Sequence, residues 1–357
     1  MKASIHKNER KKTKMRTIEW DDSDSSVKMI DQTLLPKELK MIKCKNVAEI
    51  CEAIQNLRIR GAPALGVCGA FGVALAAHLS SSNTVEGMIK DIIAAGDAIK
   101  KTRPTAINLS WGVDQIIQVV EEEGMDPHLI RNIALEEAKR MADEDVAINK
   151  RIGKNGAKLL KDGDVILTHC NAGRLACVDW GTALGVIRTA ALAGTKISVI
   201  ACETRPLNQG SRLTAWELKQ DKIPVHVIPD SAAGFLMREG LISKVIVGAD
   251  RITQEFVYNK IGTYSLSVLA KEHNIPFYVA APVSTLDPDN WEENIKIEQR
   301  SPDEIRYLGK AKELNVPEDV PILNLAFDKT PMENVSAIIT ENGNFYPPIL
   351  IDEIMLG

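Results

Sequence analysis

The second half of the chain alternates short apolar runs with stretches of helical spacing, and this alternation restricts the possible folds more than any other feature. The apolar runs are predicted strands, at Val165–Thr168, Ile197–Ala201, Val225–Ile228, Val245–Val247, Phe277–Ala280 and Ala337–Thr340. Helices are expected between them, near Leu175–Ala193, Thr214–Gln220, Ala232–Glu239 and Tyr264–Glu272. Because parallel strands need crossover connections, this order predicts an α/β fold with a doubly wound parallel sheet.

The first half of the chain predicts a small β portion followed by helices. Short candidate strands lie at Thr17–Trp20, Val27–Asp31 and Met41–Lys43. Helical spacing follows in Asn46–Leu57, in Thr84–Lys101 and in a long stretch from Pro127 to Leu160. A chain of 357 residues exceeds one comfortable core, so we predict two domains. We place a basic, disordered tail at residues 1–14, a helical N-terminal domain with a small β-sheet at 15–128, and a C-terminal domain at 129–357 that is entered through the long helix.

Composition and charge argue against several classes of partner. A net charge of −4 does not suit a nucleic-acid surface. The most apolar stretch, Ala62–Leu79, is interrupted by Gly66, Gly69 and Gly72, and we predict a buried helix there rather than a membrane span. The basic start lacks the apolar core of a signal peptide, and the six cysteines form no CxxC pair. We therefore expect reduced thiols in a cytoplasmic protein that binds neither nucleic acid nor membrane.

Reactive side chains follow several of the predicted strands. Cys170 follows the first strand, Glu203 the second, Asp230 the third and Asp250 the fourth. In an open parallel sheet, ligands bind outside the carboxyl ends of the strands. The sequence therefore predicts an active site at this edge of the sheet.

Cys170 is the strongest single candidate for a catalytic residue. It lies just before a helix that we expect to begin near Arg174, and amides at a helix N-terminus favour a thiolate, which acts as a base or nucleophile. The neighbouring His169 points to the opposite face of the strand, so we do not expect both side chains to act. The remaining cysteines on helical or strand faces are expected to be buried packing residues: Cys44, Cys51, Cys68 and Cys177.

Asp250 is the second candidate, and the residues alone allow two interpretations of it. Gly248 and Ala249 leave little bulk beside it, so a ligand can approach the backbone closely. A carboxyl group in such a crevice can stay partly protonated and act as a general acid. An N-cap for a following turn explains the same residue equally well.

A candidate phosphate cradle precedes the glycine-bearing helix. Arg60, Gly61 and Ala62 combine a guanidinium with accessible amides at a helix start. Further cations stand in loops or before helices, at Arg103 and at Lys260 next to Asn259. The chain has no Walker loop and no GxGxxG after a first strand, so nucleotide binding lacks support. The six histidines show no ligand spacing, and we expect neither a metal nor a cofactor.

Six segments resemble one enzyme family closely and in order. They are RIRGAPALGV (58–67), TRPTAINLSWGVD (102–114), THCNAGRLACVDWGTALGVIR (168–188), ACETRPLNQGSRLTAWEL (201–218), and VGADRI (247–252) with NKIGTY (259–264). The chain resembles the methylthioribose-1-phosphate isomerases, most closely those of archaeal type. That family belongs to the superfamily that includes the regulatory subunits of initiation factor 2B and ribose-1,5-bisphosphate isomerase.

The resemblance implies a fold, a reaction and a set of site residues. It implies a Rossmann-like C-terminal domain, a homodimer, and conversion of 5-methylthioribose 1-phosphate to 5-methylthioribulose 1-phosphate in methionine salvage. By motif, Cys170 matches the catalytic cysteine and Asp250 the catalytic acid. The residues that match the substrate contacts are Arg60, Gly61, Ala62, Arg103, Gln209, Asn259 and Lys260.

Three alternatives to this reading stay open at this point. The substrate could be 5-deoxyribose 1-phosphate or ribose 1,5-bisphosphate, or the chain could be a non-catalytic regulator like the initiation-factor subunits. The role of Cys170 is open as well. It either acts as a thiolate base that forms an enolate-like intermediate, or stabilises charge while a hydride moves from C2 to C1.

Overall fold

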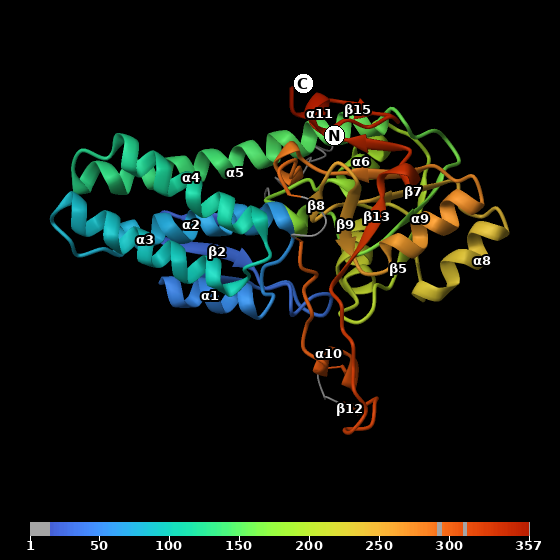
Figure 1. The fold of residues 1–357 in the computed structure, drawn as a ribbon, viewed down its shortest axis with the longest axis horizontal. Coiled ribbons are helices and arrows are strands. Elements are labelled where there is room, and N and C mark those ends of the chain that lie inside the picture. Colours follow the sequence, from blue (N-terminus) through green and yellow to red (C-terminus); the bar gives the residue numbers. More distant parts are fainter. Residues whose placement is uncertain (1–14, 291–294, 310–312, 357) are drawn as a thin grey trace, which may run out of the picture.

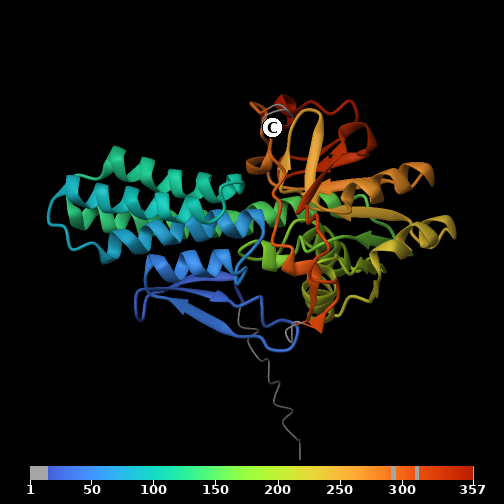
Figure 2. The ribbon, with the colours of Figure 1, turned by 60° about the horizontal axis from the view of Figure 1, so that its bottom comes forward.

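The N-terminal part of the protein joins a small antiparallel sheet to a helical layer. The computed structural model describes residues 15–290, 295–309 and 313–356, and the predicted disordered tail lies outside these ranges. The sheet has the order β1-β2-β3, and it lies against α1 and α2 (Figure 2). The elements are β1 (Ile18–Asp21), β2 (Ser26–Ile30), β3 (Met41–Cys44), α1 (Val47–Gln55), α2 (Ala62–Leu79), α3 (Val85–Thr102), α4 (Ile107–Glu123) and α5 (Pro127–Ala157).

Helix α2 is the centre of the N-terminal core, as its composition predicts. It packs against α3, α4 and α5, and 78% of its residues are buried. Among the described residues it is the one helix long and apolar enough to cross a membrane, and its burial identifies it as a core helix. Glycines allow the close packing: a Cβ on Gly112 of α4 would lie 2.0 Å from the carbonyl oxygen of Gly66 in α2.

The C-terminal part is built on a seven-stranded mixed sheet whose order is β15-β14-β10-β7-β4-β5-β6. All neighbouring strands run parallel except β15, which pairs antiparallel with β14. The six parallel strands have the order of a doubly wound fold, and the order reverses between β4 and β7. The strands are β4 (Val165–Thr168), β5 (Ser198–Cys202), β6 (Val225–Ile228), β7 (Lys244–Val247), β10 (Phe277–Ala280), β14 (Ala337–Ile339) and β15 (Asn344–Phe345). The predicted α/β class is therefore confirmed.

Helices cover both faces of this sheet (Figure 1). Neighbouring residues of a strand enter different cores: Ile166 packs with α6, whereas Leu167 packs with α8 and α9. Because side chains alternate across a strand, burial on two faces requires the continuous apolar runs seen in the sequence. The helices are α6 (Ala183–Leu192), α7 (Ala215–Gln220), α8 (Ala233–Arg238), α9 (Thr263–Glu272) and α11 (Ile351–Leu356).

The long helix α5 connects the two parts. Its residues from Ile130 to Val146 enter the N-terminal core, and Ile152 enters the core beneath the large sheet. The helix thus belongs to both cores, as expected of a linking element. The domain boundary at residues 128/129 stays a prediction.

The structure corrects one predicted helix and adds elements that the sequence did not reveal. The helix expected over Leu175–Ala193 is only a single 3-10 turn at Arg174–Ala176, and α6 itself begins at Ala183. The added elements are α4 and a three-stranded antiparallel sheet of β8 (Arg251–Ile252), β9 (Phe256–Lys260) and β13 (Phe327–Pro331). A further arm projects from the body (Figure 1) and contains α10 (Asp303–Arg306), β11 (Tyr307–Leu308) and β12 (Glu313–Leu314).

Candidate active site

The site lies where the strand order reverses. Cys170 follows β4 and Asp250 follows β7, the two strands that flank the reversal. A cavity of about 520 Å³ opens there. Seven of the nine site residues inferred from the sequence line it: Arg60, Gly61, Arg103, Cys170, Gln209, Asp250 and Lys260. The other two, Ala62 and Asn259, line a small adjoining cavity together with Cys170 and Asp250.

Cys170 is held rigidly by its backbone. Its φ of 60° is in the left-handed region, which a non-glycine residue enters only where surrounding contacts enforce it. Its N–H donates to the hydroxyl of Thr204 at 2.8 Å, and its carbonyl accepts from the hydroxyl of Thr214 at 2.6 Å. The expected helix N-terminus does not follow it, since only the short turn at Arg174–Ala176 does, so the helix-dipole argument for a thiolate is wrong.

Asp250 and Lys260 form the electrostatic centre of the cavity. Burial raises the pKa of Asp250, while the charges of Lys260, Arg60 and Arg103 oppose that rise. Burial lowers the pKa of Lys260, and the charges of Cys170 and Asp250 raise it. Strand β8 follows Asp250 directly, so Asp250 caps no helix, and the structural alternative for this residue is wrong. The raised pKa suits a group that must carry a proton before it donates one.

The N-terminal part contributes a cationic rim. Gly61 is the N-cap of α2 with a φ of 98°, and a Cβ there would lie 2.4 Å from the Cα of Ala176. Both the backbone conformation and the close approach therefore require glycine. Arg60 donates to the side-chain oxygen of Asn171 at 2.7 Å and to its backbone carbonyl at 2.8 Å. Arg60 thus ties the start of α2 to the strand end that carries Cys170.

Two further predicted residues have side-chain atoms that match a ligand-binding role. The Nη2 of Arg103 donates to Glu298 at 2.9 Å, but its buried Nε has no hydrogen-bond partner among the described residues. The buried Oε1 of Gln209 likewise has none there. Buried polar atoms are normally paired, so these two atoms mark positions that a polar ligand can satisfy. Asn259 is already engaged, because its Nδ2 donates to Thr263 at 3.0 Å.

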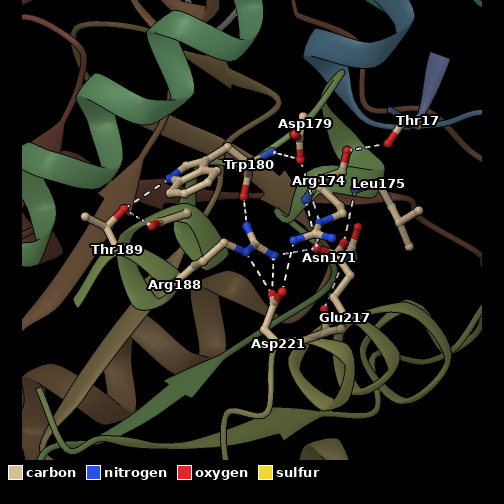
Figure 3. A network of polar contacts seen from close by, with 12 residues as sticks. Thr17, Asn171, Arg174, Leu175, Asp179, Trp180, Arg188, Thr189, Glu217 and Asp221 are labelled. Atoms are coloured by element: carbon tan, nitrogen blue, oxygen red, sulfur yellow. Dashed lines mark hydrogen bonds and ion pairs between the residues drawn. The ribbon is translucent and has the colours of Figure 1, made fainter. Parts of the chain in front are cut away.

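Sequence reasoning missed the charged network that supports the Cys170 loop (Figure 3). Its centre is Glu217, which is buried and accepts the backbone N–H groups of Arg174 and Leu175 at 2.8 and 3.1 Å. Glu217 also accepts from Asn171 at 3.0 Å and pairs with the buried Arg188 at 3.1 Å. The chain of contacts from Arg60 through Asn171 to Glu217 shows how the loop is fixed. The sequence signal was weak, because Glu217 lies in a short helix that also carries Lys219 and Gln220.

The metal-ligating side chains that the structure brings together are also unexpected. His169, Cys202 and Asp230, which follow or end three neighbouring strands, have potential ligand atoms within 4.8 Å of one another. Among the described residues this is the one such group of three. His169 of this group lines the small adjoining cavity together with Cys170.

A doubly wound domain with a thiol, a carboxyl group and a cationic helix start in one cavity defines an α/β enzyme for an anionic substrate. The profile of the Initiation factor 2 subunit family matches residues 58–347. A relative from Methanosarcina acetivorans, provisionally named methylthioribose-1-phosphate isomerase, is 60% identical over 342 residues and covers 96% of this chain and 97% of its own. The chain therefore belongs to the Initiation factor 2 subunit family, in its methylthioribose-1-phosphate isomerase branch.

Solved structures support the same assignment of the fold. The 5-methylthioribose 1-phosphate isomerase of Pyrococcus horikoshii has a TM-score of 0.88 and 44% identity, with 96% of each chain covered. A structure from A. fulgidus described as translation initiation factor eIF-2B, subunit delta, has a TM-score of 0.83 and 51% identity, with 94% of this chain and 96% of that chain covered. The two descriptions correspond to the two function classes that the sequence left open.

Proposed function

We propose that this protein is an aldose–ketose isomerase that converts 5-methylthioribose 1-phosphate to 5-methylthioribulose 1-phosphate in methionine salvage. The observation that carries the proposal is one cavity shared by Cys170, Asp250 and the cationic start of α2. The relatives named for this activity cover almost the whole chain. Arg60, Gly61 and Arg103 are assigned to the phosphate and its neighbouring oxygens, and Gln209 and Lys260 to the sugar hydroxyls.

The substrate poses a definite chemical problem, because its anomeric oxygen is esterified and the ring cannot open to a free aldehyde. In the proposed mechanism Asp250 donates its proton to the ring oxygen as the bond from C1 to that oxygen breaks. The Cys170 thiolate then removes the proton from C2, which leaves an enol between C1 and C2. Cys170 returns a proton to C1 while the C2 hydroxyl gives its proton to Asp250. Both groups thereby regain their starting states.

Lys260 supports this sequence electrostatically. It lies close enough to Cys170 and Asp250 for both charges to affect its pKa. A cation in this position stabilises the oxyanion character of the enol. The confined cavity strengthens such interactions because little water competes for them.

Solvent-deuterium incorporation distinguishes the enol route from a hydride shift. One turnover in D₂O, followed by mass spectrometry of the product, should show deuterium at C1. Complete absence of deuterium in a single turnover would count against the enol route and favour direct movement of hydrogen from C2, with Cys170 stabilising charge.

The competing function is regulatory, and the description of the A. fulgidus structure favours it. Cys170→Ser and Asp250→Asn separate the two functions in the purified full chain. We expect each substitution to lower kcat at least about 10³-fold, because each removes a proton-transfer group. A wild-type protein that turns over no sugar phosphate would reject the enzyme, and unchanged turnover in both variants would reject this site.

Substrate choice needs a kinetic comparison of three sugar phosphates. 5-Deoxyribose 1-phosphate lacks only the methylthio group, and one missing apolar group is worth roughly 1–3 kcal/mol in a pocket. We expect 5-methylthioribose 1-phosphate to have the highest kcat/KM, with measurable turnover of the deoxy sugar. A higher kcat/KM for ribose 1,5-bisphosphate would change the assigned substrate and leave the mechanism intact.

We also propose that the protein is a cytoplasmic homodimer, with α8 and α9 at its interface. The two helices pack side by side and leave apolar side chains exposed at Phe235, Leu241, Tyr264 and Val268. Tyr264 and Val268 are four residues apart, so they share one face of α9. Val268→Asp should give a monomeric mass by light scattering, whereas Leu192→Asp, at an exposed apolar residue of α6, should stay dimeric. A monomeric wild type would contradict this proposal.

A further inference from the structure

The ends of three neighbouring strands place an imidazole, a thiol and a carboxylate close to one another, next to the catalytic loop. His169 follows β4, Cys202 ends β5 and Asp230 follows β6. Their ligand atoms all lie within 4.8 Å of one another. The proposed reaction uses none of the three. Because β4, β5 and β6 are adjacent and parallel, their carboxyl ends bring these residues together although 28 or more positions separate them in sequence.

The imidazole of His169 provides an independent observation. Its Nε2 lies 2.8 Å from the carbonyl oxygen of Ile261, an acceptor, so Nε2 carries the proton. The neutral ring therefore presents a lone pair at Nδ1. That atom is buried and has no hydrogen-bond partner among the described residues. Histidine that binds a metal typically donates its other ring N–H to a carbonyl or carboxylate, which is the arrangement seen here.

The other two residues complete a ligand set of a recognisable kind. Cys202 is fully buried, and Asp230 is half-buried, so solvent touches the group at Asp230. Asp230 also accepts the N–H groups of Thr204 and Arg205 at 2.8 and 2.7 Å, which fix its carboxylate. One nitrogen, one sulfur and one oxygen ligand suit Zn²⁺, which takes these donors in tetrahedral sites.

We propose that His169, Cys202 and Asp230 form a Zn²⁺ site with a fourth position open to solvent. A tetrahedral ion holds nitrogen at about 2.0 Å and sulfur at about 2.3 Å. Two ligand atoms that are 4.8 Å apart must therefore approach each other by about 1 Å when the ion binds. Cys202 releases its thiol proton to solvent when it binds the ion. The site lies next to the active site, because His169 precedes Cys170 and Asp230 fixes Thr204, whose hydroxyl accepts the Cys170 N–H.

The test uses the full-length protein after treatment with a chelator and exchange into metal-free buffer. Zn²⁺ is added, unbound metal is removed by gel filtration, and bound metal is measured by mass spectrometry. We expect about one Zn²⁺ per chain and a higher Tm, because an ion that binds only the native state stabilises it. Wild-type protein that retains no Zn²⁺ would overturn the proposal.

Co²⁺ and three variants identify the ligands. Wild type loaded with Co²⁺ should show a thiolate-to-cobalt charge-transfer band, which Cys202→Ala should abolish together with Zn²⁺ retention. Cys68→Ala removes another fully buried thiol, in α2, and should keep both signals. Cys170→Ser should keep both as well, whereas their loss there would place the ion on the catalytic thiol and overturn the assignment. The wild-type, Cys68→Ala and Cys170→Ser results decide the question even if Cys202→Ala fails to fold.

Discussion

The start of α2 and the carboxyl edge of the large sheet meet at one cavity but contribute different chemistry. The helix start offers backbone amides and Arg60, and its shape depends on Gly61. The sheet edge offers Cys170 and Asp250, and the charges of both act on Lys260. Phosphate binding and proton transfer are thus assigned to elements from two separate cores. The contact between Arg60 and Asn171 holds the two together.

The largest effect at the junction between the two regions should come from Arg60→Lys. A lysine lacks the planar fork from which two separate nitrogens of Arg60 donate to Asn171, so we expect kcat/KM to fall about 100-fold at unchanged charge. Arg58→Lys is the matched control, since Arg58 pairs with Glu52 and Asp31 within the N-terminal part. Steady-state kinetics of both variants checks this. Equal losses in the two would mean that Arg60 has no special role in joining the regions.

The second prediction concerns the sheet edge alone and the pH dependence of the reaction. Burial raises the pKa of Asp250, so its carboxyl group stays protonated to higher pH than an ordinary aspartate. A general acid is active only when protonated, so kcat/KM should fall about tenfold per pH unit above this raised pKa. A profile of kcat/KM against pH should show this limb in wild type. Its persistence in the residual activity of Asp250→Asn would assign the limb to another group.

Sequence alone located the reactive edge because strand ends follow from apolar runs. Val165–Thr168, Val225–Ile228 and Phe277–Ala280 have the predicted bounds. Val165–Thr168 and Phe277–Ala280 are buried strands, so their signal is a continuous apolar run and does not depend on distant partners. The position of Cys170 and Asp250 at strand ends followed from that pattern, whereas the adjacency of the two strands did not.

Other features depend on contacts between residues far apart in sequence. The segment before α6 contains apolar residues at helical spacing, yet Trp180 and Gly181 have φ values of 71° and 85° and end any helix there. That loop is held by distant groups, such as Asp145, which accepts the N–H of Val178 at 2.7 Å. The grouping of His169 with Asp230 likewise requires the strand order, which apolar runs do not encode.

A smaller effect is expected from Glu298→Gln, because Glu298 contacts Arg103 on the N-terminal part of the cavity wall. Glu298 accepts from Arg103 and Arg300, each at 2.9 Å, and it holds Arg103 at the cavity. The glutamine keeps one acceptor oxygen but loses the charge, so we expect KM to rise about 3–10-fold with kcat nearly unchanged. A Michaelis–Menten comparison with wild type measures this. A change in kcat alone would place Glu298 in the chemistry rather than in the positioning of Arg103.

The smallest effect concerns the helix that links the two regions. Withdrawal from water raises the pKa of Asp145 in α5 to about 7. Between about pH 4 and pH 7 the Asp145 carboxyl group is ionised in the unfolded chain and protonated in the folded chain. This residue therefore lowers the stability of the fold as pH rises through that window. Asp145→Asn removes the charge and keeps an acceptor for the Val178 N–H. The expected effect is moderate because Asp145 is only half-buried. As pH rises from about 5 to about 8, the free energy of unfolding of the variant should increase by on the order of 1–2 kcal/mol relative to that of wild type. Urea unfolding at both pH values measures this gain, and a difference that does not vary with pH would show that the Asp145 carboxyl group titrates alike in the folded and unfolded chains.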